Sequence, residues 1–171
     1  MWELWYPKRM EIRKTNLSEL DNVMEIYARA RKFMAEHDNP TQWGNNKPSR
    51  EQVEQDIVTG KSYVCIEGNQ IAAVFYFAKE DDPTYGKIYD GQWLNGEDYA
   101  VVHRIASAGI VKGAGSFCMQ WACEQFRNIK IDTHKDNYVM QNMLKKNGFL
   151  HCGTIYLEDG EPRLAFQKVC K

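Results

Sequence analysis

Long apolar runs are missing from this sequence of 171 residues. No stretch approaches the ~18–20 consecutive apolar residues that a membrane-spanning helix needs. The first ten residues, MWELWYPKRM, also lack the apolar segment of a signal peptide. An excess of one charge is missing as well, since 22 Lys and Arg stand against 23 Asp and Glu. We therefore expect no binding to nucleic acid and none to a membrane.

Cysteine spacing of the metal-binding or redox type is absent too. The five cysteines, an odd number, stand at positions 65, 118, 123, 152 and 170 and form no C-x-x-C pair. This spacing predicts neither a metal site nor a disulfide framework. Together with the missing signal peptide, it favours a cytoplasmic protein.

The composition is that of one soluble globular domain. Hydrophobic residues make up 43% of the chain and charged residues 26%, and the length suffices for one full core but not comfortably for two. The strand-like segment MEIRKT begins at Met10. We therefore expect a single domain over residues 10–171, preceded by an N-terminal arm of residues 1–9.

Periodicity and turn residues predict a strand, two helices, three strands, a helix, a strand, a helix and two strands. The first helix is expected to begin at Ser18, which with Asp21 resembles a capping box. Strand 99–108, helix 114–127 and strand 129–134 form the one parallel crossover. The predicted fold class is α/β (α+β), with a mixed, mostly antiparallel sheet flanked by helices.

A glycine-rich turn opens the helix in VKGAGSFCMQWACEQF, residues 111–126. Such turns bind phosphate through backbone N–H groups and the helix dipole. A P-loop is excluded because no lysine follows either glycine. A dinucleotide fingerprint matches at Gly113 and Gly115 but has Cys118 in its third place, although Asp132 stands where a ribose-binding acid would. The pyrophosphate turn of acyl-CoA transferases is the third alternative.

Two segments carry a resemblance to a known family. HRIASAGIVKGAGSFCMQWA and IDTHKDNYVMQNMLKKNGFLHCGTIY, together with the element order, resemble the GNAT superfamily of acyl-CoA N-acyltransferases over about residues 10–168. The resemblance implies N-acetyltransferase activity, with acetyl-CoA as cosubstrate and no metal. A primary amine of a small-molecule or peptide acceptor would attack directly, through a tetrahedral intermediate. Sheet edges often pair in this family, so a homodimer is a further implication.

The resemblance also assigns cofactor-binding residues. Backbone amides at Ile105, Ala106 and Ser107 would bind the pantetheine arm and polarise the thioester carbonyl. Asn137 matches the asparagine that contacts the same arm, although simple N-capping of the next helix would also explain it. The pyrophosphate would lie on Val111, Lys112, Gly113, Ala114, Gly115 and Ser116.

Three positions depart from the family pattern. Ile110 replaces the usual Gln or Arg of the turn. Leu144 stands where a tyrosine often protonates the departing thiolate, and Val101 where a glutamate base would fall. If these changes mark lost chemistry, the alternative function is a non-catalytic acyl-CoA-binding module or sensor.

We therefore consider other residues as the general base and the general acid. His103 lies two positions after Val101, on the same strand face, and an imidazole suits a general base at neutral pH; a packed core histidine is the structural alternative. Tyr156 is the candidate acid, and Cys152 is a candidate with less support. A packing role in the core or at the surface would also explain either residue. Cys118 is expected to pack.

Substrate contacts are predicted at Trp43 and His134. Trp43 follows the first helix in the loop that borders the acceptor in such folds, although it would equally serve to pin that loop. His134 ends the strand beside the expected thioester and would contact the substrate or the cofactor. A loop histidine without a functional role is an equally reasonable interpretation. The near-zero net charge argues mildly against polycationic acceptors.

Overall fold

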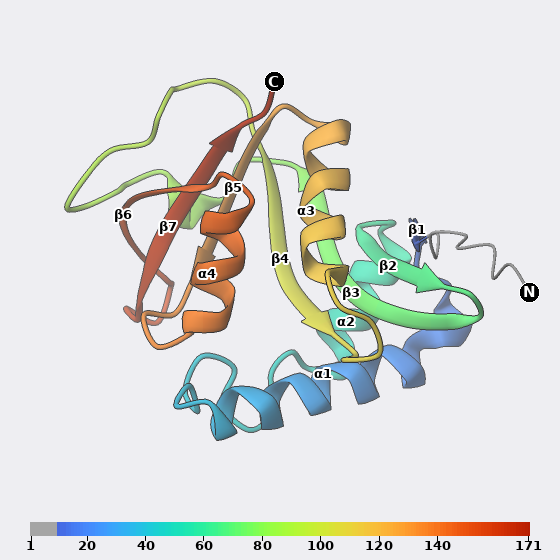
Figure 1. The fold of residues 1–171 in the computed structure, drawn as a ribbon. Helices are drawn as coiled ribbons and strands as arrows, with labels where there is room; N and C mark the ends of the chain where they lie inside the picture. The colour runs from blue at the N-terminus through green and yellow to red at the C-terminus, as the bar shows by residue number, and fades with distance from the viewer. Residues whose placement is uncertain (1–9) are drawn as a thin grey trace, which may run out of the picture.

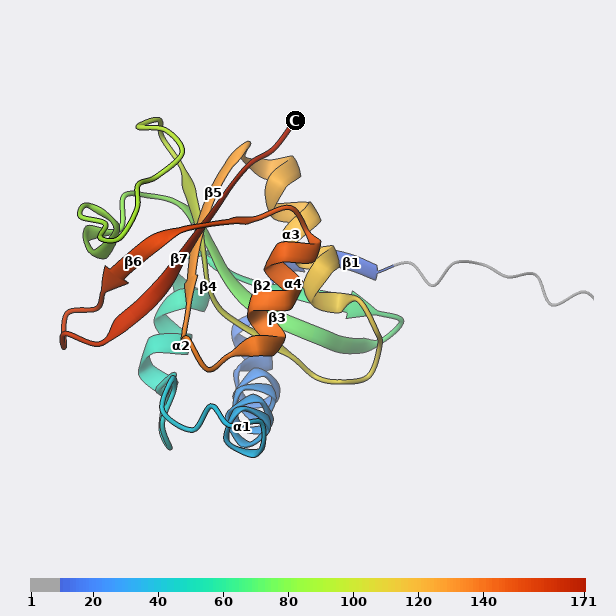
Figure 2. The same cartoon turned by 60° about the vertical axis from the view of Figure 1, so that its left-hand side comes forward.

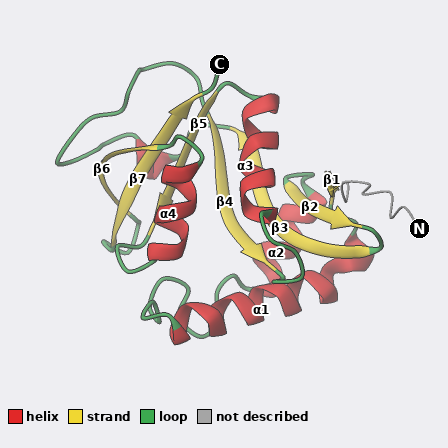
Figure 3. Ribbon diagram, in the orientation of Figure 1, coloured by secondary structure: helices red, strands yellow, loops and turns green. Residues whose placement is uncertain are grey.

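The computed structural model describes residues 10–171 (Figure 1), so the predicted arm of residues 1–9 lies outside the described residues. Helices and strands follow one another in the predicted order (Figure 3). Their bounds are β1 (Met10–Lys14), α1 (Leu20–Glu36), α2 (Arg50–Val58), β2 (Ser62–Glu67), β3 (Gln70–Lys79), β4 (Ala100–Ser107), α3 (Ala114–Gln125), β5 (Asn128–Thr133), α4 (Tyr138–Lys146), β6 (Leu150–Tyr156) and β7 (Pro162–Val169). Two short 3-10 turns, η1 (Leu17–Glu19) and η2 (Pro83–Tyr85), complete the chain.

One sheet of seven strands organises the molecule, in the order β1-β2-β3-β4-β5-β7-β6. All neighbours pair antiparallel except β4 and β5, which are parallel and joined through α3. Helices α3 and α4 cover one face of the sheet, and α1 and α2 cover the other (Figure 2). The predicted mixed, mostly antiparallel sheet is confirmed.

The parallel pair comes apart soon after it begins. Ala100 pairs with Ile129 and Val101 with Lys130, and no further pair joins the two strands. Figure 1 shows β4 curving away from β5 toward α1. From Val102 onward, the edge of β4 that faces β5 therefore has no strand partner within residues 10–171, and this edge is available to a ligand.

A β-bulge lies in β4 beside this opening. Val74 pairs with Ala106 and Tyr76 with His103, so β4 has one more residue than β3 between the two pairs. Arg104 takes up the extra length with φ 49°. Its carbonyl accepts a hydrogen bond from the Tyr27 hydroxyl at 2.9 Å. Bulges re-aim the side chains of a strand, and this one lies at the position next to His103.

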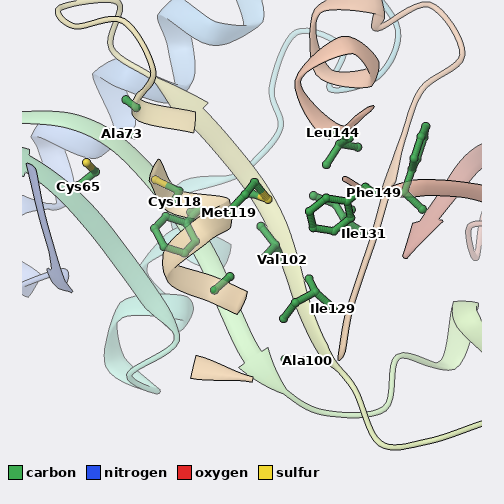
Figure 4. Packing of buried hydrophobic residues seen from close by; sticks show 14 of the residues in the cluster. Cys65, Ala73, Ala100, Val102, Cys118, Met119, Ile129, Ile131, Leu144 and Phe149 are labelled. Carbon is green, nitrogen blue, oxygen red and sulfur yellow. The ribbon is translucent and has the colours of Figure 1, made fainter. Parts of the chain in front are cut away.

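The main core lies between the sheet and the α3–α4 layer (Figure 4). Val102, Met119, Ile129 and Phe166 are among its fully buried members. Cys118 is also fully buried there, which agrees with its predicted packing role. A smaller cluster, around Tyr76, Tyr85, Val101, Ile155 and Ala165, lies on the opposite face beneath residues 80–99.

The long connection of residues 80–99 is fastened to the sheet. Its sequence predicts only a polar, turn-rich stretch. In the structure the Lys130 ammonium of β5 lies 4.1 Å from the Trp93 ring centroid and 4.0 Å from that of Tyr99. The Leu94 N–H also donates to the buried Gln167 side chain at 2.8 Å. These contacts fix the path of a segment that has little secondary structure of its own.

Two local features differ from the sequence-based expectation. The capping box at the first helix is formed by Asn16 and Glu19 around η1, not by Ser18 and Asp21, because a 3-10 turn precedes the helix. Cys123 of α3 and Cys170 after β7 form a disulfide, although the cysteine spacing gave no sign of one. The two residues are 47 positions apart, so only the fold brings them together.

Candidate active site

A cavity of about 930 Å³ opens where β4 and β5 diverge. Val102, His103, Arg104 and Ile105 of β4 form one wall, and Ile131 and Asp132 of β5 form another. Most of the remaining wall comes from the α1–α2 loop, the start of the 80–99 connection, the start of α4 and the β6–β7 turn. Its volume is that of a small-molecule site.

His103 faces this cavity and has a carboxylate partner. Its Nε2 lies 2.9 Å from Oδ2 of Asp82. The Asp82 carboxylate also accepts hydrogen bonds from the N–H and the hydroxyl of Thr84. Burial alone would raise the pKa of Asp82, but the hydrogen bonds from His103 and Thr84 outweigh it and lower the pKa to about 2. Asp82 is therefore ionised at neutral pH.

A second carboxyl group, Asp132, lies on the opposite wall. The Tyr85 hydroxyl donates to it at 2.6 Å. Burial raises the pKa of Asp132, against the opposing effect of His103 and of the Tyr85 hydrogen bond. Asp132 is the residue that a dinucleotide site would have used for a ribose, yet here it lines the same cavity as His103.

The cavity wall is rich in carboxylates. The basic side chains Lys47, Arg104 and Arg163 also line it, and Arg104 is neutralised by a two-point ion pair with Asp56 at 2.9 Å. The acidic side chains on the wall number seven: Glu80, Asp81, Asp82, Asp132, Glu158, Asp159 and Glu161. The cavity therefore carries an excess of negative charge that the net charge of the whole chain does not reveal.

The glycine turn leaves the first turn of α3 open. Its N-cap, Gly113, has φ 85°, a left-handed conformation that favours glycine. The first hydrogen bond runs from the Phe117 N–H to the Gly113 carbonyl, so the N–H groups of Ala114, Gly115 and Ser116 have no acceptor within the helix. A Cβ added at Gly113 would meet nothing within 4 Å. Unpaired donors, a helix dipole and open space together fit a pyrophosphate.

The other predicted cofactor contacts lie along the same route. Ile105, Ala106 and Ser107 occupy the part of β4 beyond its pairing with β5. Val111 is half-buried against the main core and Lys112 is exposed. Asn137 lines the cavity at the start of α4. Its Oδ1 caps the helix through the Met140 N–H and its Nδ2 donates to Gln42 at 2.9 Å, so the capping role is present.

Trp43 and His134 have different surroundings. Trp43 lines the cavity and packs edge-on against Tyr27, with ring centroids 5.7 Å apart, so it borders the site and also pins its loop. His134 is buried outside the cavity lining, and both ring nitrogens have partners. Nε2 lies 3.2 Å from the Thr41 hydroxyl and Nδ1 accepts from the Asp136 N–H at 3.0 Å. These contacts give His134 a role in holding the loop.

Tyr156 is not brought together with His103. It lies at the edge strand β6, is 44% exposed, and packs edge-on against Tyr89. Its side chain is outside the cavity lining, as is that of Cys152. The candidate acid of the sequence analysis therefore does not line the cavity that His103 faces.

Two of the departures from the family pattern are core residues. Leu144 is fully buried beside Ile131 and Phe149 (Figure 4), and Val101 is fully buried in the smaller cluster. Neither side chain reaches the cavity lining. Apolar residues at these two places fill the core.

Sequence reasoning missed Asp82 as a partner of His103. The only signal was the acidic triplet EDD at residues 80–82, within a stretch that reads as a polar loop. Across residues 10–171, no group of three or more His, Cys, Asp or Glu is placed to hold a metal ion. Within the same range, no helix has the length and apolar character to cross a membrane.

Comparison with known proteins gives matches to solved structures, whereas no family model and no curated protein matches. A GNAT-family acetyltransferase from Streptococcus agalactiae is 30% identical, with a TM-score of 0.88 over 97% of this chain and 98% of that one. A GNAT-family acetyltransferase from Listeria monocytogenes is 16% identical, with a TM-score of 0.68 over 93% and 94%. A protein from Salmonella typhimurium solved with acetyl-CoA is 12% identical, with a TM-score of 0.62 over 95% and 94%. The chain belongs to the GNAT family of acetyltransferases.

Proposed function

We propose that the protein transfers the acetyl group of acetyl-CoA to a primary amine, and that the acceptor carries a second positive charge. The observation that carries this proposal is the cavity between β4 and β5, where His103 and seven carboxylates line one space. Acetyl-CoA as donor is supported by the open first turn of α3 and by the acetyl-CoA in the Salmonella protein of the same fold.

Acetyl-CoA supplies the acetyl group as a thioester. The N–H groups of Ala114, Gly115 and Ser116 would bind its pyrophosphate, and the free edge of β4 from Val102 to Ser107 would bind its pantetheine arm. A backbone N–H at this edge would also polarise the thioester carbonyl. One such preorganised donor is typically worth ~10²–10³ in rate.

His103 would take the proton that the acceptor amine loses when its nitrogen bonds to the acetyl carbon. His103 gains one proton from the amine, and the departing thiolate needs one proton. Proton balance therefore requires no separate acid. This assignment is consistent with the burial of Leu144 and with the position of Tyr156 outside the cavity lining.

The second positive charge is inferred from the rim of the cavity. The exposed side chains of Asp81, Glu158, Asp159 and Glu161 form no ion pair with any residue from Met10 onward. Trp43 and Leu157 add apolar surface to the same wall. An acceptor with an apolar stem and a distal ammonium or guanidinium group would match this arrangement of charge.

A thiol-release assay with matched amines tests the proposal. With acetyl-CoA as donor, 1,5-diaminopentane should give a kcat/KM at least ~10-fold above that of pentylamine, because opposite charge attracts and orients the acceptor. The difference should shrink as salt is added. 5-Aminopentanoate, which has a carboxylate at the same distance, should react slowest.

Two outcomes would contradict the proposal at different levels. Equal rates for the diamine and the monoamine, or a preference for the aminocarboxylate, would rule out the second charge. Binding of acetyl-CoA without thiol release for any amine in a broad panel would favour the non-catalytic module instead.

A further inference from the structure

The surroundings of the His103 ring restrict which of its nitrogens can accept a proton. The ring is 20% exposed and lies between the rings of Tyr76 and Tyr85, with centroid distances of 5.8 and 5.9 Å. A neutral imidazole carries one N–H and one lone pair, and only the nitrogen with the lone pair can accept a proton. Which nitrogen that is depends on the hydrogen bond that the other one makes.

The partner of Nε2 is an ionised carboxylate with no proton of its own. Oδ1 of Asp82 accepts from the Thr84 N–H at 2.8 Å and from the Thr84 hydroxyl at 2.7 Å, which leaves Oδ2 for His103. The backbone N–H of Asp82 donates to the Tyr99 hydroxyl at 2.9 Å. Because an ionised carboxylate only accepts hydrogen bonds, the hydrogen lies on Nε2 of His103 and the lone pair on Nδ1.

The other carboxyl groups that interact electrostatically with His103 are engaged elsewhere. Asp132 of β5 is hydrogen-bonded to Tyr85. Glu80 binds Lys61 at 3.0 Å and the Tyr76 hydroxyl. Asp56 of α2 forms its ion pair with Arg104. Asp82 is therefore the carboxylate that orients the ring.

We propose that Asp82 is a positioning residue that fixes the tautomer of His103 in which Nδ1 is the proton acceptor. The inference rests on the proposed function. As the C–N bond forms and the C–S bond breaks, the amine proton moves to Nδ1. Asp82 stabilises the resulting imidazolium, and His103 then passes the proton to the sulfur.

The Asp82→Asn variant tests this with little change of shape. The Thr84 N–H and hydroxyl would keep the oxygen of the introduced amide at the place of Oδ1, so the amide nitrogen would face His103. An amide N–H needs an acceptor, and Nε2 would then have to give up its hydrogen. The neighbouring Asp81 lines the same cavity but forms no ion pair with a residue from Met10 onward, so Asp81→Asn is the matched control for the loss of one charge.

Nitrogen-15 NMR of histidine-labelled protein, without acetyl-CoA, gives a readout that does not depend on turnover. At a pH where the ring is neutral, wild type and Asp81→Asn should show a protonated Nε2 and a bare Nδ1, and Asp82→Asn should show the reverse. The His103 signals are assigned by their loss in His103→Gln. A bare Nε2 in the wild type would overturn the proposal without any need for a folded Asp82 variant.

Turnover supplies the second readout. Asp82→Asn should lower kcat by ~10²–10⁴, the range of a lost general base, with acetyl-CoA affinity unchanged. The control for turnover is Asp90→Asn, which alters an exposed carboxylate of the same 80–99 connection outside the cavity lining and should retain kcat. An Asp82→Asn enzyme with full kcat would overturn the positioning role. If the tautomers are as expected but the wild type releases no thiol with any amine, the proposed function fails and the role in catalysis fails with it, whereas the orientation of the ring by Asp82 stands.

Discussion

At Asp82, burial and hydrogen bonding act on the pKa of one carboxyl group in opposite directions. Burial raises the pKa, and the hydrogen bonds from His103 and Thr84 lower it further than burial raises it, to about 2 against an ordinary value of 3.8. A folded-state pKa below the unfolded value means that the ionised form stabilises the fold. The contribution is complete above the unfolded pKa and is lost as the pH falls through the folded one.

Acid unfolding should report this directly. From the shift, Asp82 contributes about 2 kcal/mol to the free energy of unfolding at neutral pH, and this share is lost between about pH 4 and pH 2. Urea unfolding of wild type and Asp82→Asn at pH 7 and at pH 2.5 measures it. The variant should be less stable at pH 7, and the gap should narrow in acid. A gap of equal size at both pH values would show that the carboxylate is not held as described.

At the scale of elements, α3 and the 80–99 connection position the two halves of the candidate site. The glycine turn and the helix after it could be predicted, because glycine spacing and helical periodicity are local. The position of Asp82 beside His103 could not be predicted, because the two residues are 21 positions apart in the sequence. The connection that carries Asp82 is held on the sheet by the contacts of Lys130 with two aromatic rings and by the amide group of Gln167, and neither contact leaves a pattern in the sequence.

The first turn of α3 gives a prediction about the donor site. A Cβ at Gly115 would meet only the Met143 side chain, at 3.8 Å or more, so Gly115→Ala should fold normally and gain some helix stability. The larger Gly115→Val should weaken acetyl-CoA binding at least ~10-fold, because its side chain would crowd the pyrophosphate on the unpaired N–H groups. Calorimetric titration with acetyl-CoA and with pantetheine, which has no phosphate, separates the two effects. Equal loss of affinity for both ligands would contradict a phosphate site at this turn.

Across the whole molecule, the order of elements and the parallel crossover followed from periodicity, because each strand and helix has its own local signal. Three features could not be predicted in this way, because each depends on residues far apart in the sequence. They are the divergence of β4 from β5, the bulge at Arg104 and the Cys123–Cys170 disulfide. The same limit applies to charge. The near-zero net charge argues mildly against a polycationic acceptor, whereas the fold gathers seven carboxylates around one cavity.

The turnover of His103→Ala tests most directly whether this cavity is the active site. With saturating acetyl-CoA and the best amine of the panel, kcat should fall by ~10²–10⁴ relative to wild type, and the acetyl-CoA dissociation constant should stay the same. His151→Ala, which alters an exposed histidine of β6 outside the cavity lining, is the control and should retain full turnover. Full turnover in a folded His103→Ala enzyme would contradict the assignment of this cavity as the active site built around His103.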